Sequence, residues 1–181
     1  MKEFLSPRCS AIFMSLGAFA LTGCSMHAIA QASERSQSLS PIATELLATH
    51  NRYRDAVNVP PLEWSDTLAA SAQAWADELA NRNAFSHSSS DYGENLWKGT
   101  ASRFSPTHMV ETWGDEAAYF IPNAVFPEVS TTGTWSDVGH YTQIVWGDTT
   151  DVGCAIATGH GWDVLVCHYS PRGNDVGERP F

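Results

Sequence analysis

Basic residues are scarce in this chain, which has 10 Lys and Arg against 20 Asp and Glu in 181 residues and a formal net charge of −10. Nucleic acid binding requires clustered Lys and Arg side chains that neutralise phosphates. Because the sequence contains no basic run, we expect no nucleic acid partner, and an anionic membrane surface would repel the chain.

Long hydrophobic runs are absent as well. The apolar run at residues 11–21 follows Lys2 and Arg8, and it is too short to span a membrane. It has the length of the hydrophobic segment of a secretory signal. The sequence therefore predicts an exported, extracytoplasmic protein.

Two cleavage sites are consistent with this signal. The sequence Leu21-Thr22-Gly23-Cys24 is similar to a bacterial lipobox, which predicts a signal at residues 1–23 and a lipid anchor on Cys24. Ordinary cleavage after Ala30 would instead give a signal at residues 1–30 and a freely secreted protein. Residues 24–40 are rich in Ser and Gln and are predicted to be a flexible tether, and residues 41–181 one folded domain.

Helical periodicity dominates the first half of this domain. Apolar spacing predicts helices at residues 41–57, at 66 to about 81, and from Ser105 onward. The third pattern places Glu116 on an apolar face, where a carboxylate needs a partner. Between these helices, residues 83–92 are predicted to be a loop.

The second half is predicted to contain strands. Residues 122–138 lack any period and are predicted to form a long surface connection, and Thr142 to Trp146 favour a strand. Residues 152–158 and 163–170 flank His160-Gly161, which predicts a hairpin. Helices followed by strands without βαβ alternation indicate the α+β class.

Cysteine is limited to four residues, and only Cys154 and Cys167 lie outside the export segment. With a two-residue turn at His160-Gly161, these two residues face each other with Cα atoms about 4.5 Å apart. This separation suits a disulfide, which export permits. Two free buried thiols are the alternative.

Four polar residues are candidates for a shared site. His140 lies just before the predicted strand 142–146, while His87, Glu94 and Glu116 come from a loop, a Gly-Glu-Asn turn and a helix. Imidazole and carboxylate groups suit zinc or a similar divalent ion. Hydrogen-bonded His–Glu pairs without metal explain the same residues equally well.

Several motifs in one order carry a family resemblance. The segment 139–146, Gly-His-Tyr-Thr-Gln-Ile-Val-Trp, together with Gly93-Glu94-Asn95 and Val166-Cys167-His168-Tyr169, resembles the CAP superfamily of cysteine-rich secretory, antigen five and pathogenesis-related proteins. The resemblance covers residues 42–181, and the lipobox-like sequence indicates a bacterial SCP-like member. It implies an α-β-α sandwich with a small antiparallel sheet between helices.

The resemblance also implies a site and a function. The family's pocket residues fall on His87, Glu94, Glu116 and His140, with metal bound through the two histidines and the glutamates behind them. Relatives carry lipids or sterols, or bind protein partners, beside the loop before the central histidine. Here that loop offers apolar side chains as possible ligand contacts: Phe120, Phe126 and Trp135.

The sequence favours binding over catalysis. We expect a monomeric binding module for a small apolar ligand, or for an envelope or host protein. The alternative is a hydrolase that uses Glu94 and Glu116, with or without metal. Ser86 and Ser88 lie next to His87, but no nucleophile elbow is visible.

Overall fold

The computed structural model describes residues 39–181. The predicted signal segment, the tether up to residue 38 and the proposed lipidation site Cys24 lie outside the described residues. Lipid anchoring therefore stays a prediction. Within residues 39–181, none of the helices combines the length and apolar character needed to cross a membrane.

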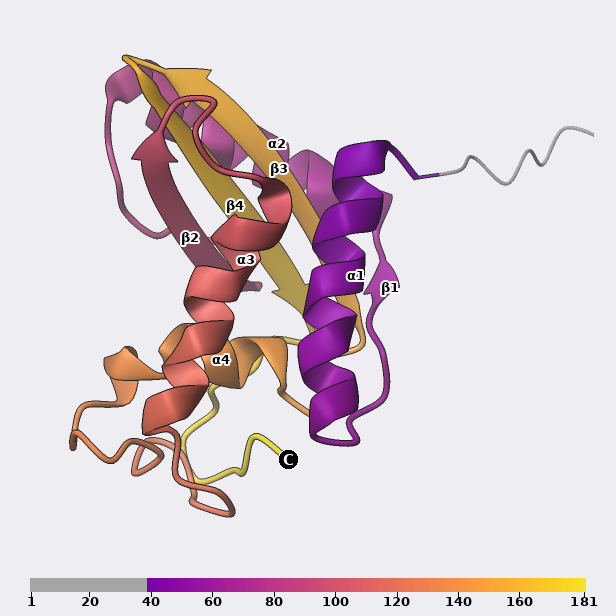
Figure 1. Ribbon diagram of the computed structural model, residues 1–181, viewed down its shortest axis with the longest axis vertical. Helices are drawn as coiled ribbons and strands as arrows, with labels where there is room; N and C mark the ends of the chain where they lie inside the picture. Colours follow the sequence, from indigo (N-terminus) through magenta and orange to yellow (C-terminus); the bar gives the residue numbers. More distant parts are fainter. Residues whose placement is uncertain (1–38) are drawn as a thin grey trace, which may run out of the picture. The chain divides into compact units, whose positions relative to one another are not determined.

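The described chain forms three layers (Figure 1). Helices α1 and α3 cover one face of a four-stranded sheet, α2 covers the other face, and α4 lies at one end of the sheet. This arrangement is the predicted α-β-α sandwich. The elements are α1 Pro41–Ala56, β1 Glu63–Trp64, α2 Asp66–Arg82, β2 Gly93–Thr100, α3 Pro106–Gly114, the 3-10 helices η2 Asp115–Tyr119 and η3 Trp135–Asp137, α4 Gly139–Ile144, β3 Asp151–Gly159 and β4 Trp162–Ser170.

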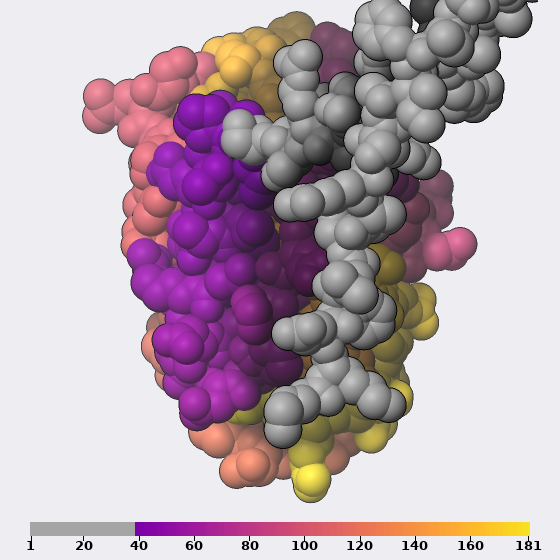
Figure 2. Space-filling view, turned by 90° about the vertical axis from the view of Figure 1, so that its right-hand side faces the viewer, coloured from indigo at the N-terminus to yellow at the C-terminus, as the bar shows by residue number. Residues whose placement is uncertain are grey.

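Serine hydroxyl groups begin the three long helices. The hydroxyl oxygens of Ser40, Ser65 and Ser105 accept hydrogen bonds from backbone N–H groups in the first turns of α1, α2 and α3. Such caps satisfy donors that have no partner inside the helix. Figure 2 views the molecule from the right-hand side of Figure 1 and shows α1, in indigo, as an outer surface.

The sheet has the strand order β1-β3-β4-β2. Neighbouring strands are antiparallel except for the two-residue β1, which pairs in parallel with β3. The predicted hairpin register is confirmed, because Gly159 pairs with Trp162 and Cys154 with Cys167. Cys154 and Cys167 form the predicted disulfide, with their Cα atoms 4.1 Å apart.

The prediction of a strand at residues 142–146 is wrong. Residues 139–144 form α4, and every side chain from Tyr141 to Trp146 is buried. The guanidinium of Arg54, itself buried, donates hydrogen bonds to the carbonyl oxygens of Ile144 and Trp146 at 3.0 and 2.8 Å. These tertiary contacts satisfy the end of α4 and outweigh the local preference for strand.

Two other local predictions also need correction. The Gly-Glu-Asn segment is no turn, because Gly93, Glu94 and Asn95 begin β2 and pair with β4. The third helix ends at Gly114, so Glu116 lies in η2 instead of on an α-helix. A Cβ atom on Gly114 would lie 2.0 Å from the Tyr53 ring, so this glycine allows α1 and α3 to approach closely.

Candidate functional site

A cavity of about 770 Å³ lies where β2, α4 and the C-terminal segment meet. Its wall includes three of the four predicted polar residues: His87, Glu94 and His140. Phe126 and Trp135 also line it, and residues 172–176 and Glu178 form part of its rim. The volume lies in the range of small-molecule sites, about 300–1,000 Å³.

His140 is held by Glu116. Nδ1 of His140 donates a hydrogen bond to Glu116 Oε1 at 2.6 Å, and the backbone N–H groups of His140 and Tyr141 donate to Oε2 at 3.0 and 3.1 Å. The imidazole also stacks on Trp113, with ring centroids 5.9 Å apart. Glu116 therefore fixes the orientation of His140 from outside the cavity wall.

His87 is held in a similar way by Glu94. Nδ1 of His87 donates to Glu94 Oε1 at 2.5 Å. The hydrogen bond from this imidazole to the carboxylate raises the pKa of His87, chiefly because it favours the charged ring. The imidazole of His87 is largely exposed, whereas Glu94 is nearly buried.

Glu94 accepts more than one hydrogen bond. Nε2 of His168 donates to its Oε2 at 3.0 Å, and the backbone N–H of Ser88 donates to Oε1 at the same distance. Burial alone would raise the pKa of Glu94, but the hydrogen bonds from His168, His87 and Ser88 lower it to about 2. Glu94 is therefore an ionised carboxylate with both oxygens occupied.

The sequence offered no partner for His168. The structure pairs His168 of β4 with Glu94 of β2, so their side chains share one face of the sheet. The feature that would have revealed this pair is the strand formed by residues 93–100. Once that strand is known, the register brings Glu94 and His168 together.

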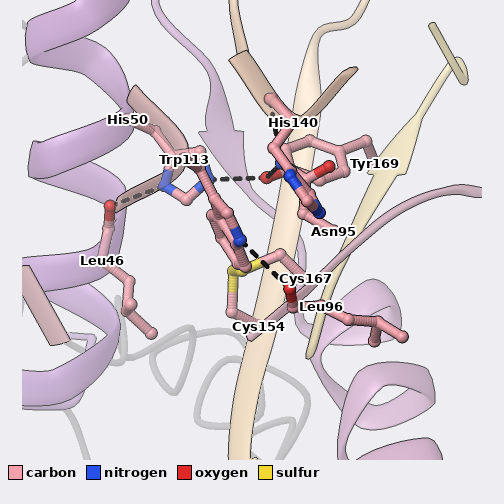
Figure 3. Close-up of a disulfide and its surroundings, with 9 residues drawn as sticks. All are labelled: Leu46, His50, Asn95, Leu96, Trp113, His140, Cys154, Cys167 and Tyr169. Atoms are coloured by element: carbon pink, nitrogen blue, oxygen red, sulfur yellow. Dashed lines mark hydrogen bonds between the residues drawn. A yellow bond between two sulfur atoms is a disulfide. The ribbon is translucent and has the colours of Figure 1, made fainter. Parts of the chain in front are cut away.

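Behind His140 lies a buried polar chain (Figure 3). His50 of α1 lies in the core, and its Nδ1 donates to the Leu46 carbonyl oxygen at 2.8 Å. Its Nε2 accepts a hydrogen bond from the Tyr169 hydroxyl at 2.8 Å, and the Asn95 amide donates to both Tyr169 Oη and the His140 carbonyl oxygen at 3.1 Å. This series of hydrogen bonds thus connects α1 to the backbone of His140.

The three predicted apolar contacts separate in the structure. Phe126 and Trp135 lie edge to face at 5.3 Å on the cavity wall. Phe120 lies outside this wall and packs against Tyr141 and Phe181, with ring centroids 5.4 and 5.6 Å apart. Trp135 is about half exposed, so its ring is available to a bound molecule.

Within residues 39–181, only one group of three or more potential metal ligands converges, and it lies outside the cavity. The ligand atoms of His50, Cys154 and Cys167 all lie within 4.8 Å of one another. Because the two sulfur atoms form the disulfide, they are not thiolates and cannot act as ligands of that kind. In the cavity, the groups suited to a metal are the Nε2 atoms of His87 and His140, which their carboxylate partners leave free.

Comparisons with known proteins agree with this architecture. The model of the cysteine-rich secretory protein family, CAP, matches residues 47–169. Pathogenesis-related protein 1A of Nicotiana tabacum is 38% identical over 138 residues, which cover 76% of this chain and 79% of that protein. Pathogenesis-related protein PR-1 of Medicago truncatula is 37% identical over 142 residues, covering 76% and 78%.

Solved structures show the same fold. The structure of BmVAL-1 is 27% identical, with a TM-score of 0.65, and the match covers 81% of this chain and 85% of that one. The structure of NaASP2 with Zn2+ is 23% identical, with a TM-score of 0.64, covering 81% and 88%. The sequence match, the three layers and the shared fold lead to one conclusion: the chain belongs to the cysteine-rich secretory protein (CAP) family.

Proposed function

We propose that the cavity is a binding site of an exported protein and that His87 and His140 bind a divalent metal there, with Zn²⁺ as the best candidate. One observation carries this proposal: both imidazoles line one cavity while a carboxylate holds Nδ1 of each ring. A carboxylate on one nitrogen orients a histidine and strengthens the other nitrogen as a ligand.

The donor set fits zinc chemically. Imidazole nitrogen is a preferred zinc ligand, and two protein ligands leave positions of a tetrahedral ion to water or to a bound molecule. When bound, the metal would act as a Lewis acid toward an oxygen or nitrogen atom of that molecule. Among structures of this fold, NaASP2 has been solved with Zn2+.

Calorimetry tests the metal site. Protein stripped with EDTA is titrated with ZnCl₂, and we expect one site that weakens at least tenfold in His87→Ala and in His140→Ala. His108→Ala is the matched control, because His108 is exposed and stacks on Phe104 outside the cavity lining. Equal heats in the wild type and in the double variant of His87 and His140 would end the metal proposal.

The apolar wall supports a ligand with an apolar body, such as a lipid or sterol. Trp135 and Phe126 form this wall, and Arg172 and Asn174 offer polar groups across the same cavity. Phe120 is no part of the proposed contact, because it is packed against other aromatic rings. A protein partner that inserts an apolar side chain would use the same wall.

Retention of radiolabelled cholesterol on a filter tests this ligand class. We expect wild-type protein to retain it and Trp135→Ala to lose most of the retention. Trp162→Ala is the control, because Trp162 is similarly exposed but lies at the β3–β4 turn. Retention that is equal in the wild type and Trp135→Ala would remove this wall from the proposal.

Hydrolysis by Glu94 and Glu116 finds less support. Both oxygens of each carboxylate already accept hydrogen bonds. With a pKa of about 2, Glu94 is also a weak base. The two glutamates are better suited to orient imidazoles than to take protons from water.

A further inference from the structure

A second cavity, of about 350 Å³, opens on the α2 side of the sheet. Ser71 and Trp75 of α2, the serines 88–90 and His168 of β4 line it. We propose that Ser71, His168 and Glu94 form a serine-nucleophile site in this cavity, which cleaves small esters. Ser71 is the nucleophile, His168 the base and Glu94 the residue that positions the base.

The distances place these three groups in series. Ser71 Oγ lies 3.1 Å from His168 Nδ1, and His168 Nε2 lies 3.0 Å from Glu94 Oε2. An activated serine needs a base within hydrogen-bond reach and a third group that orients the base. The site differs from the metal proposal, since it requires neither His87 nor His140.

Hydrogen-bond chemistry fixes the direction of this series. The Glu94 carboxylate only accepts, so Nε2 of His168 carries a hydrogen, and in the neutral ring Nδ1 has a lone pair. Ser71 must then donate its O–H to Nδ1. The proton that has to leave the nucleophile thus already points at the base.

Burial suits the three roles. His168 is 1% exposed and Glu94 is nearly buried, so their contact is shielded from water. Ser71 is half-buried, whereas Ala74, Ser89 and Ser90 at the rim are exposed. A substrate can therefore reach Ser71, and the Glu94 carboxylate, which accepts a hydrogen bond from His168 Nε2, stabilises the imidazolium that forms.

The reaction balances with water as the only co-reactant. Ser71 Oγ bonds to the ester carbonyl carbon while its proton passes to His168 Nδ1. The ester C–O bond then breaks, and His168 gives this proton to the departing alcohol. Water attacks the acyl-serine in the same manner, which releases the carboxylic acid and restores Ser71.

The cavity limits the substrate to small acyl groups. Its volume is at the lower end of small-molecule sites, and the Trp75 ring supplies an apolar wall. The hydroxyl groups of Ser88 and Ser90, which bond to each other at 2.9 Å, line the same cavity. Since one of these hydroxyl groups donates to the other, the second can donate to the carbonyl oxygen as it becomes negative.

Covalent labelling tests this proposal. EDTA-treated protein is incubated with an alkyl fluorophosphonate, and separately with p-nitrophenyl acetate, and intact mass and peptide mapping locate any adduct. We expect one adduct on Ser71 in the wild type and in the control Ser86→Ala, which replaces an exposed serine outside the cavity lining, and none in Ser71→Ala. Alanine favours helix, so Ser71→Ala should stay folded.

The base and the positioning residue have their own readouts. His168→Asn keeps a donor toward Glu94 but has no base, so labelling should slow at least 100-fold while thermal denaturation shows a folded protein. In Glu94→Gln, the ¹⁵N shifts of His168 should change from one tautomer to a mixture.

Three results would overturn the proposal. They are no adduct in the wild type, an adduct that persists in Ser71→Ala, and equal labelling rates in the wild type and His168→Asn. The variant His140→Ala should label like the wild type. This outcome separates the proposal from the metal site.

Discussion

At the scale of single residues, His50 shows how a titratable group is kept neutral in the core. Burial lowers the pKa of His50 to about 4, because no water solvates the charged ring. Leu46 and Tyr169 satisfy both ring nitrogens in the neutral form. Protonation would break the bond that Nε2 accepts and leave a charge in the core.

We predict that His50 makes the fold sensitive to acid. The folded-state pKa lies below that of an ordinary histidine, so the unfolded chain takes up a proton first as pH falls. The stabilisation that neutral His50 contributes is present above about pH 6.5 and decreases as pH falls toward 4. Between pH 7 and pH 4.5 the free energy of unfolding falls by about 2 kcal/mol for this reason. Urea unfolding at both pH values measures this loss.

His50→Gln is the matched variant for this measurement. We expect this variant to be less stable than the wild type at pH 7. Between pH 7 and pH 4.5 it should lose about 2 kcal/mol less free energy of unfolding than the wild type, because it has no imidazole to protonate. A wild type and a variant with the same pH dependence would contradict the assignment to His50.

At the scale of secondary structure, α2 lies very close to β3. A Cβ atom on Gly153 would lie 2.1 Å from the backbone nitrogen of Ala69 and 2.5 Å from the carbonyl oxygen of Ser65. Glycine at this position therefore allows the helix backbone to approach the strand. The approach also brings Ser71 of α2 within reach of His168 of β4.

Gly153→Ala should destabilise the protein by roughly 2 to 3 kcal/mol, because helix backbone cannot move aside as a flexible side chain can. Gly147→Ala is the control, since its new Cβ would lie 3.4 Å from its nearest neighbour, the Pro180 carbonyl oxygen. The control should stay within about 0.5 kcal/mol of the wild type in urea unfolding. Equal stability of the two variants would be evidence against the tight contact.

The helices and strands also show which parts of this structure the sequence can predict. Helices α1 and α2 and the β3–β4 hairpin follow from apolar spacing, proline, serine and a turn signal, all of which are local. Helix α4 depends on Arg54 from α1, and β2 depends on pairing with β4. The missed role of His168 follows directly from the missed strand, because its partner lies 74 residues earlier.

At the scale of the whole molecule, hydrogen bonds between distant segments of the sequence hold together the end of the fold that contains the larger cavity. The backbone N–H of Phe126 donates to the Glu178 carbonyl oxygen at 2.7 Å, and Gly147 N–H donates to the Pro180 carbonyl oxygen at 2.6 Å. Within the core, the disulfide joins β3 and β4 across 13 residues. The site thus depends on segments from most of the described chain.

Loss of the disulfide should lower stability by about 3 kcal/mol, since it closes a short loop in the unfolded chain. For a domain of this size, the double variant Cys154→Ala/Cys167→Ala should melt about 6 to 12 °C lower than the wild type. Intact mass after alkylation provides the control, measured on protein without residues 1–30, which contain Cys9 and Cys24: two alkylations are expected only after reduction. Two alkylations without reductant would contradict the bond.

The predicted lipid anchor on Cys24 concerns the protein as a whole and can also be tested. In a bacterial host, wild-type protein should sediment with membranes and incorporate a palmitate analogue, and Cys24→Ala should do neither. One acyl chain alone binds weakly, so multiple chains are needed for stable anchoring. Equal release of both proteins into the medium would favour cleavage after Ala30.

Glu94 contacts His87 with one oxygen and His168 with the other, so the two proposed sites share one carboxylate. A loss of function in a Glu94 variant consequently does not tell which of the two sites has failed, whereas the His168 tautomer reports on one site alone. Genetic dissection should begin with His140 on one side and Ser71 on the other, where a single replacement disturbs a single pocket.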